Sequence, residues 1–509
     1  MKKFFSGNFK LYLSVFIFFW ALFALTNTGY DYSEGGYHYE VAENIIKTGN
    51  LGFDTPKDGI FTLAPNGRTY ASHEIGNTVF MLPTAFVNVL LENVLSGFLD
   101  RENISTLKEF ILSFQFGCYS AITLTAFFGI LQNGFGQKII PNFLATLGLG
   151  ITTFFWTFTR ESYDAVLCST LLIGSLLFLV LFKQTGKQLY IIAAFVCLGF
   201  GFITRISMVL PIAVSFGYLI LVSRGTAIAK LKNICLAGLT IVPFVLWQCW
   251  YNHLRTGFFY LSPVQTDEKY KFVNSLDGNI FVGIQGLLFS PGKSIFIYAP
   301  LLILSVFLFK KFYKEYKKET VYILALTISW FLLHARLRSW YGAWGWGPRH
   351  LLPILPILFL PFAANIEYVL KKTSLKISAI LLSSFGFALA LCSIISSWFW
   401  RIKLADKAGM LGDDIFIWGI SNSQAVDMFK AAVRNLLTFY WVITSTTNKT
   451  NNLWYLKAGM REYGSFTLNI WPNSITYLGV PWYLIAPCVI FLLFLMYISF
   501  KNIKSYDNS

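Results

Sequence analysis

The chain of 509 residues is 55% hydrophobic and 18% aromatic but only 13% charged, and its mean hydropathy is +0.57. Soluble domains carry about 25% charged residues, so this composition excludes a water-soluble protein. The formal net charge is +16. Such a charge is compatible with two classes of partner, nucleic acids and anionic membrane lipids.

Apolar stretches long enough to cross a hydrocarbon core of about 30 Å recur along the whole chain. The first follows Lys2, Lys3 and Lys10 and lacks a small-residue cleavage site, so we expect a retained helix rather than a removed signal peptide. The pattern predicts an all-α polytopic membrane protein of about twelve helices, near residues 10–27, 110–132, 139–157, 165–182, 189–204, 206–222, 234–250, 294–309, 320–335, 350–364, 377–398 and 481–499.

The positive charges predict the orientation of these helices. With both termini in the cytoplasm, the cytoplasmic segments hold 19 of the 41 Lys and Arg residues but only 4 of the 25 Asp and Glu residues. This asymmetry follows the positive-inside rule. The basic charge therefore indicates contact with anionic lipid heads, and a nucleic-acid partner is not expected.

The apolar stretch 75–97 needs a different reading. Counting it as a full crossing would place the five lysines between residues 310 and 318 outside, against the positive-inside rule. We therefore predict a re-entrant or surface-lying helix on the outer face. The long outer stretches are then 28–109, 251–293 and 399–480, and all five histidines fall in outer loops or at outer helix ends. Function is expected outside.

The first outer loop contains a predicted amphipathic helix. From Tyr37, apolar residues recur at helical spacing opposite charged ones, until Gly49 ends the run. Asp31 and Glu34 precede this helix. A carboxylate there, half desolvated at the bilayer edge, can act as a base. The alternative is that it stabilises the helix N-terminus.

Further polar clusters follow at the outer ends of the helices. One combines Arg68, Tyr70, His73 and Glu74, and others contain Arg160 with Asp164, and Arg205. Each charge alone is typical of an interfacial anchor. Together they suit an anionic lipid head, because Arg holds phosphate oxygens with two parallel hydrogen bonds.

The last cluster is the segment RLRSWYGAWGWGPRHLLPILP, in which tryptophans alternate with glycines. It can be an interfacial aromatic belt. It can also form a close-packed apolar surface for a sugar ring. Its candidate functional residues are Trp344, Arg349 and His350.

The order of these segments resembles the C-type (GT-C) membrane glycosyltransferases. It is most similar to the prokaryotic group related to protein O-mannosyltransferases (glycosyltransferase family 39) and lipid A aminoarabinose transferases. The resemblance covers roughly residues 10–365 and has no counterpart for 399–480. The matching segments are Glu34 with Tyr37-His38 and the helix through Gly49, the stretch from Gly67 to Gly76, GLLFSPGKSIFIYAPLL (286–302), and SWYGAWGWGPRHLLPILP (339–356).

The resemblance implies a GT-C-type transmembrane bundle with amphipathic juxtamembrane helices in the first outer loop. Residues 1–398 would form the catalytic region, with 28–109 as its first outer loop. Residues 399–480 would form an extracytoplasmic segment, and 481–509 the last transmembrane helix with a cytoplasmic tail. The protein is expected in a prokaryotic plasma membrane.

The implied activity is transfer of a sugar from a polyprenyl-phosphate donor to a hydroxyl of a lipid, glycan or protein on the extracytoplasmic side of the membrane. The catalytic carboxylate of the group is usually an Asp. Here Glu34 stands at that place and Asp31 lies nearby, so both are candidates for the base. No cofactor is expected, and a divalent metal is left open. The expected substrate-binding residues are Tyr37, His38, Arg68, Tyr70, His73, Glu74, Arg160, Asp164, Arg205, Lys293, Trp344, Arg349 and His350.

The main alternative is a lipid or glycan flippase or transporter without transferase activity. Such proteins place ionisable or helix-breaking residues at mid-membrane depth, often in related halves. The predicted spans here are nearly free of charge, and no internal repeat is visible. An oligosaccharyltransferase would carry a WWDYG-type segment, for which RSWYGAWGW is a poor substitute.

Overall fold

The computed structural model describes residues 2–30, 35–266, 275–342, 345–398, 402, 416–444, 468–477 and 480–507. The candidate residues Asp31, Glu34 and Trp344 lie outside the described residues. Most of the described chain is helical, as the composition predicts.

The first half of the chain begins with one long helix and a small α/β unit. Its elements are α1 (Lys2–Leu25), α2 (Gly35–Thr48), β1 (Phe61–Leu63), β2 (Thr69–Ala71), α3 (Gly76–Leu95), α4 (Arg101–Ile130), the π-helical turn η1 (Leu131–Phe135), α5 (Ile139–Ile151), α6 (Phe155–Phe158), α7 (Asp164–Thr185), α8 (Gln188–Thr204), η2 (Ile206–Met208), α9 (Val209–Val222) and α10 (Ala227–Thr256). Strands β1 and β2 pair as an antiparallel hairpin, with Thr62 opposite Tyr70.

The second half consists of helices separated by short turns and two longer loops. Its elements are α11 (Pro263–Thr266), α13 (Ile280–Phe289), α14 (Ile295–Tyr298), α15 (Leu302–Glu315), α16 (Lys317–Arg336), η3 (Arg349–Ile354), α17 (Leu355–Ala363), α18 (Ile366–Lys371), α19 (Thr373–Ile395), α22 (Gln424–Thr444), α24 (Trp471–Tyr477) and α25 (Trp482–Asp507).

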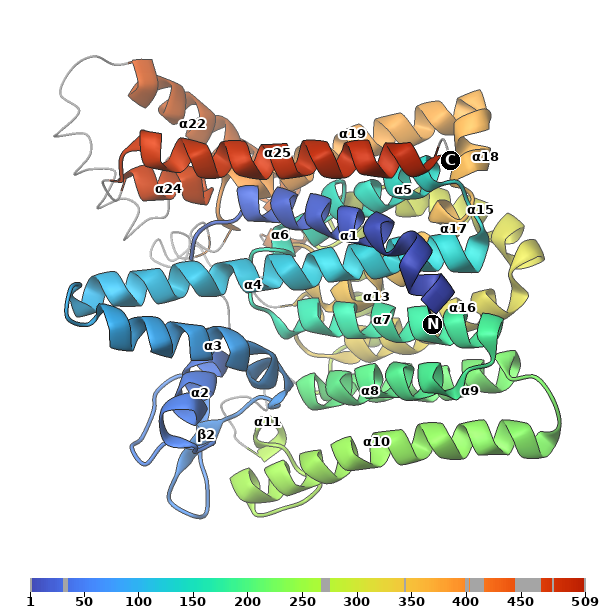
Figure 1. The fold of residues 1–509 in the computed structure, drawn as a ribbon, viewed down its shortest axis with the longest axis horizontal. Coiled ribbons are helices and arrows are strands. Elements are labelled where there is room, and N and C mark those ends of the chain that lie inside the picture. The colour runs from blue at the N-terminus through green and yellow to red at the C-terminus, as the bar shows by residue number, and fades with distance from the viewer. Residues whose placement is uncertain are drawn as a thin grey trace.

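Figure 1 shows the helices running back and forth along one axis, with both chain termini at the same end of the bundle. We call this the terminal end and the opposite one the distal end. The bundle helices are α1, α4, α5, α7, α8, α9, α10, α15, α16, α17, α19 and α25, which confirms the expected architecture of about twelve helices.

The outer surface of the bundle is suited to lipid. Six of the described helices are long and apolar enough to cross a membrane, namely α3, α4, α7, α10, α19 and α25. Large apolar side chains such as Leu239, Leu381 and Ile490 are largely exposed on these helices. So much exposed apolar surface is unfavourable in water and indicates a surrounding bilayer. The protein is therefore an integral membrane protein.

Helix α3 lies at the distal end and does not cross the bundle. The Asn27 side chain, just after α1, donates a hydrogen bond of 2.7 Å to the Ser113 carbonyl. The part of α4 before Ser113 therefore projects about 18 Å beyond α1. Helix α3 packs along α4, where Asn88 donates to the Lys108 carbonyl (3.1 Å) in the projecting part and Tyr119, further along α4, donates to the Phe80 carbonyl (2.6 Å).

Helix α2, the hairpin and α3 form a unit at the distal end (Figure 1), which we call the distal cap. Paired charges attach it to α4. Lys108 of α4 pairs with Glu43 of α2 and, at 3.1 Å, with Glu92 of α3. Lys47 lies 2.7 Å from Glu43 and 2.8 Å from Glu92. Four charges from three helices thus neutralise one another at this junction.

Two glycines let the distal cap approach the bundle closely. A Cβ atom on Gly35, the first residue of α2, would lie 1.7 Å from Ser162 Oγ. One on Gly76, the first residue of α3, would lie 2.2 Å from Thr204 Oγ1 and 2.6 Å from the Thr204 backbone nitrogen. Only glycine fits at these contacts. They place the starts of α2 and α3 beside the start of α7 and the end of α8.

We predict that Gly76→Ala lowers the free energy of unfolding by about 1–3 kcal/mol, because the added methyl overlaps backbone atoms that cannot move aside. Thermal unfolding of the purified protein measures this. Gly238→Ala is the matched control, since a Cβ at Gly238 meets nothing within 4 Å. Equal melting temperatures for the two variants would contradict the proposed close contact.

Candidate functional site

An ion pair at the distal end forms the centre of the candidate site. Arg205, directly after α8, places a guanidinium nitrogen 3.7 Å from an Asp164 carboxylate oxygen at the start of α7. A second guanidinium nitrogen of Arg205 lies 3.0 Å from His350 Nδ1 in η3. The side chains of Arg205 and Asp164 are 18% and 32% exposed. The pair is therefore partly desolvated but still accessible.

The hydrogen-bond partners assign the protons of two neighbouring imidazoles. Because a guanidinium only donates, His350 Nδ1 accepts from Arg205, and a neutral His350 carries its proton on Nε2. The His334 ring lies next to it, tilted, at a centroid distance of 5.2 Å, and its Nδ1 donates to the Trp330 carbonyl at 2.8 Å. The Trp330 indole donates to the His350 carbonyl at 2.8 Å. These contacts fix the position of η3 against α16.

Arg349 extends the positive charge beyond Arg205. Its guanidinium lies over the Tyr163 ring, 4.6 Å from the centroid, a favourable cation–π distance. The methylene chain of Arg349 packs against a glycine-rich loop, where a Cβ on Gly345 would lie 2.4 Å from Arg349 Cδ. Gly342 in the same loop has φ +76°, a conformation that suits glycine. Glycines here make room for the arginine.

Lys293 stabilises this glycine-rich loop through hydrogen bonds to its backbone. The Lys293 side chain is almost fully buried, and its ammonium donates to the carbonyls of Gly345 (2.6 Å) and Gly347 (3.2 Å). Gln424 of α22 donates to the Gly345 carbonyl at 3.2 Å and accepts from the Gly347 amide at 2.9 Å. In this structure Lys293 shapes the loop that carries Arg349.

Two histidines from the distal cap complete the group. The His38 and His73 rings are 6.0 Å apart, and His38 Nδ1 lies 3.2 Å from Thr78 Oγ1. Asp164 is within electrostatic range of both histidines as well as of Arg205 and Arg349. We call these six residues the Asp164 cluster: His38, His73, Asp164, Arg205, Arg349 and His350. They come from five segments that are far apart in the sequence.

A buried arginine that the sequence analysis did not single out holds the segment before α3 in place. Arg255, near the end of α10, donates to the carbonyls of Ala71 (3.0 Å), Ser72 (3.0 Å) and His73 (2.7 Å). Glu74 is also buried and attracts the Arg255 charge. From the sequence alone, Arg255 would be interpreted only as a positive charge that favours the C-terminal end of a helix. Its partners lie about 180 residues earlier.

Three other predicted site residues lie on the hairpin side of the distal cap. Arg68 pairs with Asp54 at 2.8 Å. Tyr70 accepts a hydrogen bond of 2.9 Å from the Asn66 side chain. Tyr37 packs edge-on against Phe61. These contacts stabilise the hairpin, and they do not bring the three residues into the Asp164 cluster.

Arg160 is a buried junction between the bundle and the segment 399–480. Its guanidinium donates to the carbonyls of Ser393 (3.0 Å), Ile394 (2.9 Å) and Asn469 (3.0 Å). Burial lowers the pKa of Arg160 to about 10, so the group remains charged at neutral pH. The terminal nitrogens of Arg160 thus donate to backbone carbonyls, and the residue also lines a small pocket with Tyr30 and Glu161.

Among the described residues, no group of three or more His, Cys, Asp or Glu side chains is arranged to hold a metal ion. The Asp164 cluster instead presents two guanidinium groups and two cap histidines, the buried His38 and the half-buried His73, around a single carboxylate. Such an arrangement can bind an anion that carries more than one negative oxygen, because Arg donates in a planar fork.

No protein-family model matches the chain, and no curated protein sequence matches it. Among solved structures, ArnT from Cupriavidus metallidurans bound to undecaprenyl phosphate is similar, with a TM-score of 0.50 and 13% sequence identity over 97% of this chain and 76% of that one. The oligosaccharyltransferase AglB from Archaeoglobus fulgidus, in complex with an inhibitory peptide and a dolichol-phosphate, has a TM-score of 0.47 and 11% identity, over 90% of this chain and 60% of that one.

At such low sequence identity the similarity to ArnT concerns the fold. It extends over nearly the whole chain, including the bundle and the distal cap. The fold implied by the sequence segments is therefore confirmed, and this polytopic membrane protein has the fold of the GT-C membrane glycosyltransferases.

Proposed function

We propose that the protein transfers a sugar from a polyprenyl-phosphate donor to an acceptor hydroxyl at the distal end. The observation that carries this proposal is the convergence of Arg205, Arg349 and His73 on Asp164. Three cationic or protonatable groups at a membrane edge suit a lipid phosphate. The similar fold of ArnT, whose structure contains undecaprenyl phosphate, supports the same ligand class.

In the proposed reaction the acceptor oxygen attacks the anomeric carbon of the sugar. Its proton passes to Glu34 or Asp31, and the bond from the anomeric carbon to the phosphate oxygen breaks, so polyprenyl phosphate leaves. The phosphate gains negative charge as this bond breaks. Fixed cations beside it stabilise the transition state more than the ground state and lower the barrier. The phosphoester bond supplies the driving force, so the proposal includes no cofactor.

Four residues of the Asp164 cluster are assigned roles in the proposed reaction. Arg349 and Arg205 are proposed to hold the phosphate, with Asp164 keeping the Arg205 guanidinium in position through the 3.7 Å contact. His73 is half-buried and can donate a proton or a hydrogen bond to the same group. The acceptor, whether a lipid, a glycan or a protein, would enter from the distal side.

The distal end is proposed to face away from the cytoplasm of a prokaryotic cell, with both termini inside. The positive-inside rule supports this, since Lys310, Lys311, Lys314, Lys317 and Lys318 surround the α15–α16 turn. That turn is at the terminal end, because Lys183 near the end of α7 pairs with Glu319 at 2.6 Å.

The first test identifies the base. Replacing the true base by an isosteric amide should reduce transfer from a polyprenyl-phospho-sugar by about 10²- to 10⁴-fold, because general-base catalysis is lost. We therefore expect a large loss for Glu34→Gln or Asp31→Asn, and the larger one marks the base. Glu40→Gln is the control, since Glu40 is exposed and pairs with Lys57. Full activity in both loop variants would exclude a carboxylate base in this segment, and a protein that only flips lipid would show no transfer at all.

The second test concerns the leaving phosphate. Arg349→Gln should lower kcat by about 10²- to 10³-fold, as removal of a transition-state hydrogen-bond donor does in other enzymes. Arg349→Lys should be less severe because it keeps the charge. The control is Arg338→Gln, an exposed arginine that pairs with Asp277. An increase in KM with unchanged kcat would instead place Arg349 in ground-state binding.

The third test concerns orientation. Cysteines are introduced at Asp58, exposed in the distal cap, and at Lys317, exposed at the terminal end. A membrane-impermeant maleimide should label the cysteine at 58 in intact cells, and the cysteine at 317 only after permeabilisation. The parent chain gives the background from its native cysteines. The reverse labelling would place the Asp164 cluster in the cytoplasm.

A further inference from the structure

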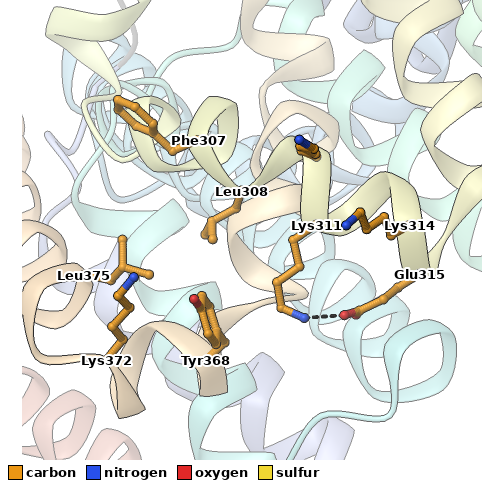
Figure 2. Close-up of a pocket in the computed structure, with 9 residues that line it drawn as sticks. Phe307, Leu308, Lys311, Lys314, Glu315, Tyr368, Lys372 and Leu375 are labelled. Atoms are coloured by element: carbon orange, nitrogen blue, oxygen red, sulfur yellow. Dashed lines mark hydrogen bonds and ion pairs between the residues drawn. The ribbon is translucent and has the colours of Figure 1, made fainter.

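A second polar site lies at the terminal end of the bundle, away from the Asp164 cluster. There a cavity of about 490 Å³ opens between the end of α15 and the α18–α19 turn. Figure 2 shows Lys311 and Lys314 on the α15 side and Tyr368 and Lys372 on the other. Binding pockets for small ligands typically measure about 300–1,000 Å³. The cavity is therefore large enough for a lipid headgroup.

The lining of this cavity is strongly cationic. Phe307 lies three and four residues before Lys310 and Lys311, and Lys314 lies four and three residues after them, so these side chains share one face of α15. Lys372 faces them from the α18–α19 turn. Four lysines against one glutamate, Glu315, leave three positive charges in the lining.

Most of this positive charge is not neutralised by the protein. Lys311 pairs with Glu315 and lies 5.4 Å from the centre of the Tyr368 ring. Lys310, Lys314 and Lys372 make no ion pair or side-chain hydrogen bond with any residue that the structure describes. Like charges gathered around one cavity repel one another. An anion bound there would relieve this repulsion.

The same cavity has an apolar wall that continues onto the lipid-facing surface. Phe307, which is 75% exposed, Leu308 and Leu375 contribute to the lining. Exposed Val306 and Ile377 follow on α15 and α19. A soluble anion would gain no binding energy from this apolar wall. An amphiphile with an anionic head and acyl chains matches both parts.

The cavity is separated from the Asp164 cluster by the length of the bundle. Asp164 is the first residue of α7, whereas Lys183, near the other end of α7, contacts Glu319 beside the α15–α16 turn. A helix of 22 residues is about 33 Å long, close to the thickness of the hydrocarbon core. One lipid headgroup therefore does not reach both sites.

We propose that the cavity lined by Lys310, Lys311, Lys314, Tyr368 and Lys372 binds the headgroup of an anionic phospholipid from the leaflet at the terminal end. The lysines hold the phosphate oxygens, and the acyl chains lie along Phe307 and the exposed face of α19. Basic pockets between helices at the cytoplasmic interface are suited to such headgroups. This lipid is neither donor nor acceptor in the proposed transfer reaction.

The test uses the full-length protein in detergent with phosphatidylglycerol or phosphatidylcholine, and counts retained lipids by native mass spectrometry. Each surface lysine contributes about a fivefold factor toward anionic lipid. Replacing Lys310, Lys314 and Lys372 by Gln should therefore weaken binding of the most tightly held phosphatidylglycerol by about 10- to 100-fold. Phosphatidylcholine binding should not change.

A control variant replaces Lys232, Lys501 and Lys504 by Gln, which removes the same charge from exposed positions outside the cavity. It should retain phosphatidylglycerol like the parent chain. The single variant Lys372→Glu repeats the test with minimal disturbance of the fold. Equal losses in the two triple variants would overturn the proposal, because they would indicate general charge attraction. Displacement of the lipid by excess inorganic phosphate would overturn it as well, in favour of a soluble anion.

Discussion

The arrangement of the distal end depends on keeping the charge of Arg205 paired at the edge of a membrane. An unpaired guanidinium is costly in a medium of low dielectric constant. Arg205 therefore holds Asp164 at the start of α7 and His350 at the start of η3. Through this one side chain, the end of α8 contacts the starts of α7 and η3. The distal cap adds His38 and His73 to the same place because glycine contacts bring it close.

The sequence predicts the bundle well, because hydropathy carries most of the information about where apolar helices lie. It also predicts the amphipathic helix that ends at Gly49. The sequence does not reveal the hydrogen-bond partners of the buried polar side chains. Lys293 and Arg160 look like phosphate ligands in sequence, yet both donate to backbone carbonyls. In the sequence, Arg255 looks like an ordinary charged residue at the end of a helix. Hydrogen bonds between residues 50 to 300 positions apart leave no local pattern that spacing could reveal.

The two ends of the molecule present different kinds of positive charge. At the distal end, arginines are held by aromatic rings, glycines and a carboxylate, which gives them a fixed geometry suited to a reacting phosphate. At the terminal end, most of the lysines lining the cavity are exposed and flexible. Lys is a mobile point charge, whereas Arg forms planar and directional contacts. The chain thus uses Arg where position matters and Lys where attraction is sufficient.

The part of α4 that projects beyond α1 affects how the distal cap is oriented. The distal cap is fixed to it by Asn88 and by the charges of Glu43, Glu92 and Lys108. An α-helix turns by about 100° with every residue. Insertion or loss of a single residue between Lys108 and Ser113 would therefore rotate the Lys108 contacts about the helix axis relative to the Tyr119–Phe80 contact, so the cap could not keep both. The rotational phase of this part of α4 therefore couples the attachment of the cap to its position beside the bundle.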